Sequence, residues 1–269
     1  MCRKLAFAAT ALMLTPLLLA ASPALAWGSQ PAAKAAPQTA SQAPARPSSN
    51  ARPKASAADR AAAERMEPLG RAAFWAAQVD ADPKDAEAGV KLASALRGIG
   101  RFQEAYEAAQ AVLVYQPNCV DALLETARVA VSDNQGFFAI EPARKAMKIA
   151  PKDWRAPSLL AVGLDQADRP VEALAAHQLA LQLAPENPIA LSNAALFYAA
   201  QGDRAQAETL LRKAAALPGA GLSVRQNLAL VLGLQGKLAE AAQIQTQDLP
   251  PQMAANNLAY FQAASAAVK

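Results

Sequence analysis

The side chains that most often perform acid–base, nucleophilic or metal chemistry are scarce in this sequence of 269 residues. His177 is the only histidine, and the two cysteines are Cys2 and Cys119. A single histidine cannot form a His-based metal site, and no Gly-rich phosphate loop, paired-cysteine metal motif or Gly-x-Ser-x-Gly sequence is present. The inventory predicts a protein that is not an enzyme and that uses no cofactor, metal or small-molecule substrate. We interpret His177 as a packed or partly exposed side chain.

Two asparagines offer chemistry of another kind. Asn193 and Asn227 are 34 residues apart, and each amide carries both a hydrogen-bond donor and an acceptor. If a repeated structure stacks them, they can hold the backbone of an extended peptide without reading its sequence. The alternative interpretation is a solvated polar face.

The elements that carry these side chains are predicted to be helices. About a quarter of the chain is alanine, only 5% is aromatic, and β-branched residues are sparse. Strands need runs of Val, Ile, Thr and aromatic residues, so an all-β fold is excluded.

A period of 34 residues runs through most of the chain, which is the mark of a repeat architecture. Pro83, Pro117, Pro151 and Pro185 follow it, and Pro218 lies one residue short of the next position. A column of turn-forming residues consists of Gly100, Asn134, Asp168, Gly202 and Gly236. Two columns consist of alanine alone: Ala93, Ala127, Ala161, Ala195 and Ala229, and Ala105, Ala139, Ala173, Ala207 and Ala241.

Each column predicts one part of a helix pair. The turn column is expected to end a first helix in the left-handed backbone conformation. Asp203 is a predicted N-cap of a second helix, and the prolines separate one pair from the next. Alanine in both columns lets the two helices of a pair approach closely.

These positions resemble the tetratricopeptide repeat (TPR), a 34-residue helix–turn–helix unit. The resemblance implies an all-α fold, a right-handed superhelix of stacked antiparallel helix pairs. The predicted array occupies residues 59–269, with repeats at about 86–119, 120–153, 154–187, 188–221 and 222–255 and with flanking helices, including a single helix near 59–81. Pro142 departs from the pattern and is expected to kink the second helix of repeat two.

The resemblance also implies that the first helices line a concave groove that binds polypeptide partners. The predicted partner-binding residues are Glu125, Arg128, Asn193, Gln226 and Asn227. Further polar positions on the same face are Glu87, Lys91, Arg97, Asp121, Arg155 and Asp165. The carboxylate clamp of some TPR proteins is not reproduced, because Ser158, Val162 and Ser223 occupy the positions of its Lys and Asn residues.

The N-terminal part of the chain differs in character from the repeats. Residues 1–26 are predicted to be a signal peptide, with a charged start, an apolar stretch broken by Pro16 and a small-x-small pattern that ends at Ala26. Cleavage after Ala26 places the protein in the periplasm; a membrane anchor is the alternative. Residues 27–58 contain five prolines among Ala, Ser and Gln and are predicted to form a disordered Pro/Ala-rich linker.

The formal charge of +4 arises in this N-terminal part. Six of the 26 basic residues precede the first acidic residue, Asp59, so 20 basic residues stand against 22 acidic ones from Asp59 onwards. No electrostatic footprint for nucleic acid remains in the repeats.

The C-terminal stretch 226–260 carries a further resemblance. It runs from Gln226-Asn227-Leu228 through Gly236-Lys237 and Asp248-Leu249-Pro250-Pro251 to Asn256-Asn257-Leu258-Ala259-Tyr260, and it resembles TadD of the tight-adherence (Flp) pilus assembly system. The resemblance implies a periplasmic adaptor with a pilotin-like role toward the secretin. Its partners would be the secretin or other Tad components, with membrane association only through them.

Two points qualify this resemblance. Members of that family often carry a lipidated Cys after the apolar stretch, whereas this chain has Ser22, so an outer-membrane lipoprotein is disfavoured. The alternative function is a TPR scaffold for another cell-envelope process, such as outer-membrane or peptidoglycan maintenance.

Overall fold

The computed structural model describes residues 54–266. The predicted signal peptide and residues 27–53 of the predicted linker lie outside this range and stay predictions. Residues 54–266 contain thirteen α-helices and no strand, which confirms the predicted all-α class. The helices are α1 (Ala57–Ala63), α2 (Pro68–Ala81), α3 (Ala86–Gly98), α4 (Phe102–Tyr115), α5 (Val120–Ser132), α6 (Phe137–Ile149), α7 (Arg155–Gln166), α8 (Pro170–Leu183), α9 (Pro188–Ala200), α10 (Arg204–Ala216), α11 (Leu222–Leu234), α12 (Leu238–Asp248) and α13 (Pro251–Ala266).

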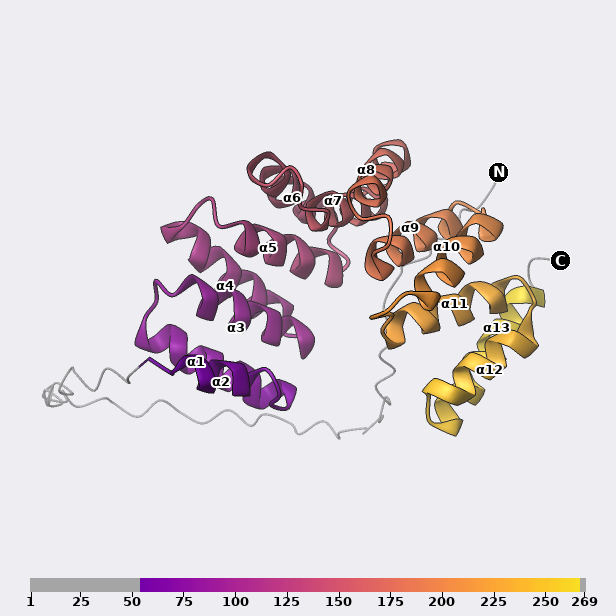
Figure 1. The fold of residues 1–269 in the computed structure, drawn as a ribbon, viewed down its shortest axis with the longest axis horizontal. Coiled ribbons are helices and arrows are strands. Elements are labelled where there is room, and N and C mark those ends of the chain that lie inside the picture. Colours follow the sequence, from indigo (N-terminus) through magenta and orange to yellow (C-terminus); the bar gives the residue numbers. More distant parts are fainter. Residues whose placement is uncertain (1–53, 267–269) are drawn as a thin grey trace, which may run out of the picture. The chain divides into compact units, whose positions relative to one another are not determined.

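Helices α3 to α12 form five consecutive pairs (Figure 1). The first helices α3, α5, α7, α9 and α11 each pack against their own second helix and also against the first helix of the next pair. The second helices of successive pairs do not come within 8 Å of each other between Cα atoms. The array is therefore held together mainly along its first helices.

The two alanine columns lie where the helices of a pair cross. All ten alanines are completely buried, with 0% exposure. Their methyl groups leave no room for a larger side chain, so the helix backbones approach closely. The expected role of these columns is confirmed.

The turn column adopts the predicted left-handed conformation. The φ angles are +78° at Gly100, +55° at Asn134, +56° at Asp168, +91° at Gly202 and +79° at Gly236. The next residue in each case donates its amide to a carbonyl five positions earlier, as Arg169 does to Leu164 and Lys237 to Leu232. This is the Schellman bond that ends a helix at a left-handed residue.

The proline column starts a β-turn between the pairs. Pro83, Pro117, Pro151 and Pro185 each follow the C-cap residue of the preceding helix, and an amide two residues further on donates back across the turn, as Asn187 does to Ala184. The residue that closes this turn also leads into the next first helix. Asp85 and Asn187 cap their helices through the side chain, whereas Cys119 occupies the same position with no side-chain cap and is half-buried rather than fully buried.

The N-terminal region differs from the expectation of one helix over 59–81. Pro68 starts α2 and restricts Glu67, so the segment is divided into α1 and α2. Ser56 and Asp59 form a capping box, which makes α1 begin at Ala57, two residues before the predicted end of the linker. Pro142 is accommodated within α6, which continues to Ile149.

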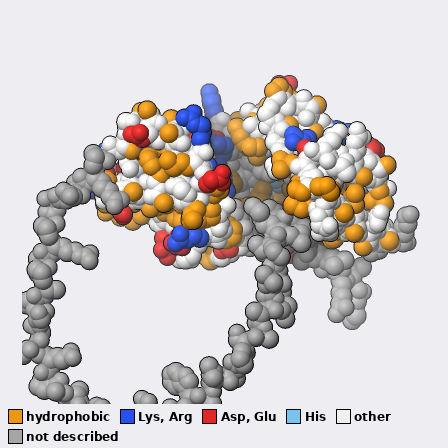
Figure 2. Space-filling model, turned by 90° about the horizontal axis from the view of Figure 1, so that it is seen from below, with side chains coloured by type: hydrophobic (Ala, Val, Ile, Leu, Met, Phe, Trp, Pro, Cys, Tyr) orange, Lys and Arg blue, Asp and Glu red, His pale blue; other side chains and the backbone are white. Residues whose placement is uncertain are grey.

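Helix α13 covers the last pair. Phe261 is 4% exposed and packs against Gly233 of α11, where a Cβ atom would come within 2.4 Å of its ring. Of the helices described, none is long and apolar enough to span a bilayer. Figure 2 shows acidic, basic and hydrophobic side chains interspersed on the face that it draws.

The backbone strain at the turn predicts a stabilising substitution. Asp168→Gly should raise the free energy of unfolding by about 0.5–1 kcal/mol, because glycine adopts a positive φ without the Cβ penalty. The matched control is Gly202→Ala, where a Cβ would contact nothing within 4 Å and only the backbone term of about 1 kcal/mol is lost. Urea unfolding measures both; equal or opposite signs would contradict the argument.

The alanine crossings predict the reverse for added volume. Ala161→Phe should destabilise the protein by about 1–3 kcal/mol through overpacking between α7 and its neighbours. Ala175→Phe, on the exposed side of α8, is the control and should change little. Thermal melting compares the two; an unchanged Ala161→Phe midpoint would show that the crossing has room to spare.

Candidate partner-binding surface

The first helices carry the polar side chains that the sequence predicts for partner binding. Asn193 lies on α9 and Asn227 on α11, one period apart. Asn193 Nδ2 donates to Ser158 Oγ of α7 at 3.0 Å, and Asn227 Nδ2 donates to Ser192 Oγ of α9 at 2.9 Å. We call these two hydrogen bonds the Ser–Asn links. Each one joins a first helix to the first helix before it.

The Ser–Asn links orient the two amides. Ser158 and Ser192 are buried, at 3% and 4% exposure, whereas both asparagines are half-buried. Neither Asn Oδ1 accepts a hydrogen bond from another residue within 54–266. Each asparagine thus has a fixed rotamer and an acceptor that is still available to a peptide amide.

Glu125 has a different environment from the one its polarity suggests. Its side chain is only 2% exposed, and its two oxygens accept from Arg97 Nε of α3 at 2.7 Å and from Arg128 on its own helix. The carboxylate therefore anchors two arginines and is itself shielded from a partner. The guanidinium groups of Arg97 and Arg128 are the parts that a partner can reach, with side chains 23% and 34% exposed.

Arg155 makes the corresponding link between α7 and α5. It pairs with Asp121 at 3.1 Å and with Asp153 at 2.6 Å. The hydrogen bonds from Arg155 hold the pKa of Asp153 below its usual range, against the opposing effect of partial burial. Asp165, near the end of α7, has its pKa raised by burial and by the nearby charge of Asp168.

Gln226 belongs to a polar network at the C-terminal end. It donates to Asp248 Oδ2 at 3.3 Å and accepts from Gln245 Nε2 at 2.7 Å, and Gln245 Oε1 in turn accepts from Asn257 at 2.8 Å. Arg225 binds the same Asp248 carboxylate at 2.8 Å and lowers its pKa. The amide of Gln226 thus joins α11 to α12 and, through Gln245, to α13.

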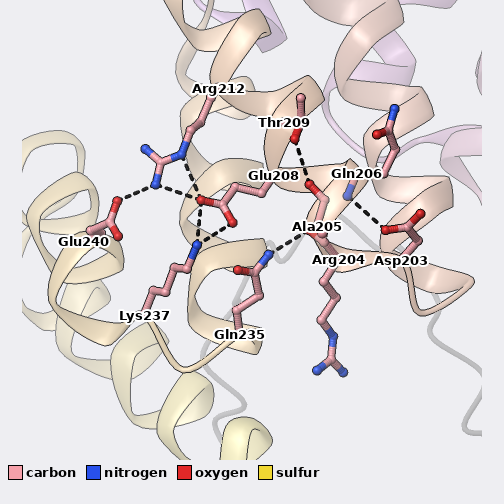
Figure 3. Close-up of polar contacts among 10 residues, drawn as sticks. All are labelled: Asp203, Arg204, Ala205, Gln206, Glu208, Thr209, Arg212, Gln235, Lys237 and Glu240. Atoms are coloured by element: carbon pink, nitrogen blue, oxygen red, sulfur yellow. Dashed lines mark hydrogen bonds and ion pairs between the residues drawn. The ribbon is translucent and has the colours of Figure 1, made fainter.

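The second helices carry ionic links that the sequence analysis missed. Glu208 of α10 accepts from Lys237 at 2.7 Å and from Arg212 at 2.9 Å, and Arg212 also pairs with Glu240 of α12 (Figure 3). The bond from Lys237 is the main reason that the pKa of Glu208 is lowered. A recurring spacing could have revealed the pattern, because Arg144–Glu172 and Arg212–Glu240 have the same separation of 28 residues.

His177 lies in the core, as one of its two predicted interpretations requires. It is 2% exposed, packs against Phe197 with ring centroids 5.1 Å apart, and has no partner for Nδ1. Burial lowers its pKa to about 4. Within the described residues, no three His, Cys, Asp or Glu side chains are grouped closely enough to hold a metal ion.

Solved structures provide the comparison for this arrangement. A TPR protein from Parabacteroides merdae ATCC 43184 superimposes with a TM-score of 0.63 at 14% identity, over 72% of this chain and 78% of that one. The TPR protein TTC0263 of Thermus thermophilus gives 0.58 at 20% identity, over 66% and 98%. The fold is a TPR-type helical solenoid. No protein-family model and no curated protein sequence matches the chain.

A third structure agrees with this TPR fold. MamA from Desulfovibrio magneticus RS-1 gives a TM-score of 0.50 at 22% identity, over 58% of this chain and 89% of that one. Identities at this level establish the TPR architecture and leave the partners of this chain to its own residues.

The buried His177 predicts a pH-dependent stability. Its folded pKa of about 4 lies below the ordinary 6.5, so the unfolded chain takes up a proton first as the pH falls. Stability is therefore complete above pH 6.5 and is lost as the pH falls toward 4, by about 2 kcal/mol at pH 5. Urea unfolding at pH 7 and pH 5 should show this loss.

His177→Leu is the matched control, because Leu211 occupies the same position one period later. This variant should lose less stability than the parent between pH 7 and pH 5. Equal losses in the two proteins would assign the pH dependence to other groups.

Proposed function

We propose that this protein is a non-enzymatic adaptor whose first helices hold an extended segment of a partner protein. The observation that carries the proposal is the pair of Ser–Asn links. Two asparagines, one period apart, are locked by buried serines and keep their carbonyl oxygens available. Equivalent acceptors at a regular interval suit the regular amides of a peptide backbone.

The arginines of the same face add a second element of recognition. Arg97 and Arg128 are both held by the buried Glu125, so two positive charges are paired with one shielded negative charge. This local excess favours a partner segment with an acidic side chain near α3 and α5. The asparagines then hold the backbone further along the array, near α9 and α11.

The proposed setting is the periplasm, where the protein would assist assembly of the Flp/Tad pilus secretion channel with a pilotin-like role toward the secretin. The predicted leader and the resemblance of stretch 226–260 to TadD support this proposal. That stretch forms most of α11, α12 and the first part of α13. Another cell-envelope process, such as outer-membrane or peptidoglycan maintenance, is the alternative that the experiment must separate.

Site-specific photo-crosslinking in the bacterium that encodes the chain tests partner and surface together. A photoreactive residue at position 193 or 227 should give adducts with the secretin or another Tad component. The control position is Gln178, which is exposed on the second helix α8. Adducts only with unrelated envelope proteins would favour the alternative, and adducts that are equal at all three positions would contradict the first-helix surface.

The asparagines themselves predict a measurable loss. Asn193→Ala combined with Asn227→Ala should weaken binding of the crosslinked partner segment by about tenfold, since two backbone-directed hydrogen bonds are removed. Fluorescence anisotropy with the synthetic segment measures the change. The double variant Gln178→Ala with Gln206→Ala, on the second helices, should bind like the parent.

A further inference from the structure

A cleft of about 520 Å³ opens between the second helices α4 and α6. Its base includes Leu123 of α5 and Ile140 of α6, which are 3% and 6% exposed. Tyr106 and Leu113 of α4 line one side, and Phe138 of α6 contributes to the other. The size and the apolar lining are those of a site that takes up an apolar side chain.

Two phenylalanines stand exposed beside this cleft. Phe137 is 70% exposed and Phe138 is 56% exposed, and their rings meet edge to face at 5.7 Å. Adjacent exposed aromatic rings cost solubility and do not help the chain to fold, which marks them as candidates for an interaction.

The repeat register shows that Phe138 is an exception. At the same position the other pairs carry Glu104, Glu172, Gln206 and Glu240. Two of these acids form ion pairs between successive second helices, Arg144–Glu172 and Arg212–Glu240. Between α4 and α6 the corresponding positions are Gln110 and Phe138, so no ion pair closes this junction.

The charges around the cleft are mainly positive. Arg144, Lys145 and Arg169 line it, against the single acid Glu141. Arg144 and Arg169 share one carboxylate outside the cleft, that of Glu172, and Lys145 has no ion pair with any residue in 54–266. The cleft is therefore complementary to an acidic segment. The chain before Asp59 contains no acidic residue, so it does not have this chemistry.

Pro142 adds a backbone acceptor to the cleft. It lines the cleft within α6 and has no amide hydrogen, so the carbonyl of Phe138 lacks the donor that a helix supplies four residues later. An amide of a bound peptide can supply that donor.

We propose that this cleft is a second docking site, which binds a short linear segment of a partner protein that carries an apolar side chain next to acidic residues. The apolar side chain enters between α4 and α6 over Leu123 and Ile140, and the acids lie against Lys145 and the two arginines. This site uses second helices and is independent of the first-helix surface and of the proposed pilus role.

A library of random twelve-residue peptides displayed on phage, selected on the whole protein, tests the proposal. Peptides that bind the parent protein but not Phe138→Glu are expected to combine Phe, Leu or Trp with Asp and Glu. A synthetic peptide of this set should lose at least about tenfold in affinity with Phe138→Glu and with Lys145→Glu, measured by fluorescence anisotropy.

Three features keep the test decisive. Glutamate occurs at the position of Phe138 in three other repeats, and Lys145→Glu changes only a charge at a half-exposed position, so at least one variant should keep the parent's circular dichroism and melting point. Val171→Glu, at a residue 83% exposed on α8, is the matched control and should bind normally. The proposal is overturned if no selected peptide depends on Phe138, if the dependent peptides are basic, or if sedimentation shows a dimer that only Phe138→Glu dissolves.

Discussion

Ten alanine methyl groups set the distance between the helices of every pair. Because these methyls are fully buried, the two helix backbones of a pair have one close spacing, and the orientation of each first helix follows from it. The larger buried side chains then fill the space around the crossings, among them Leu124, Leu164, Leu211 and Leu232. Every interaction between pairs, including the Ser–Asn links and the second-helix ion pairs, depends on this spacing.

Periodicity was sufficient to predict the elements and their boundaries. The columns at 34 residues predicted where helices stop, because a left-handed turn and a proline act locally on their own residues. Residues 100, 134, 168, 202 and 236 therefore have positive φ even where the side chain is Asn or Asp. The division at Pro68 lay outside the period, and it was missed although proline gave a local signal.

The partners of individual side chains were less predictable. Glu125 was expected on a binding surface and is instead buried between two arginines, because a charged residue on a first helix is shielded when the next first helix brings an opposite charge over it. Gln226 and Asn257 meet through Gln245 rather than at a distance of one period. These contacts depend on side-chain reach across three helices, which a one-dimensional repeat does not encode. The sequence analysis also considered only the first helices as a binding surface, and so did not single out Phe138.

The contact between Phe261 and Gly233 has a consequence for the length of the array. A stack of identical pairs ends in an uncovered layer that a further pair, or another molecule, can join. The ring of Phe261 occupies the space beside Gly233 that a further first helix would need, and α13 turns Gln252, Asn256 and Gln262 toward solvent. The last helix thus acts as a terminator that opposes end-to-end polymerisation at this end of the stack.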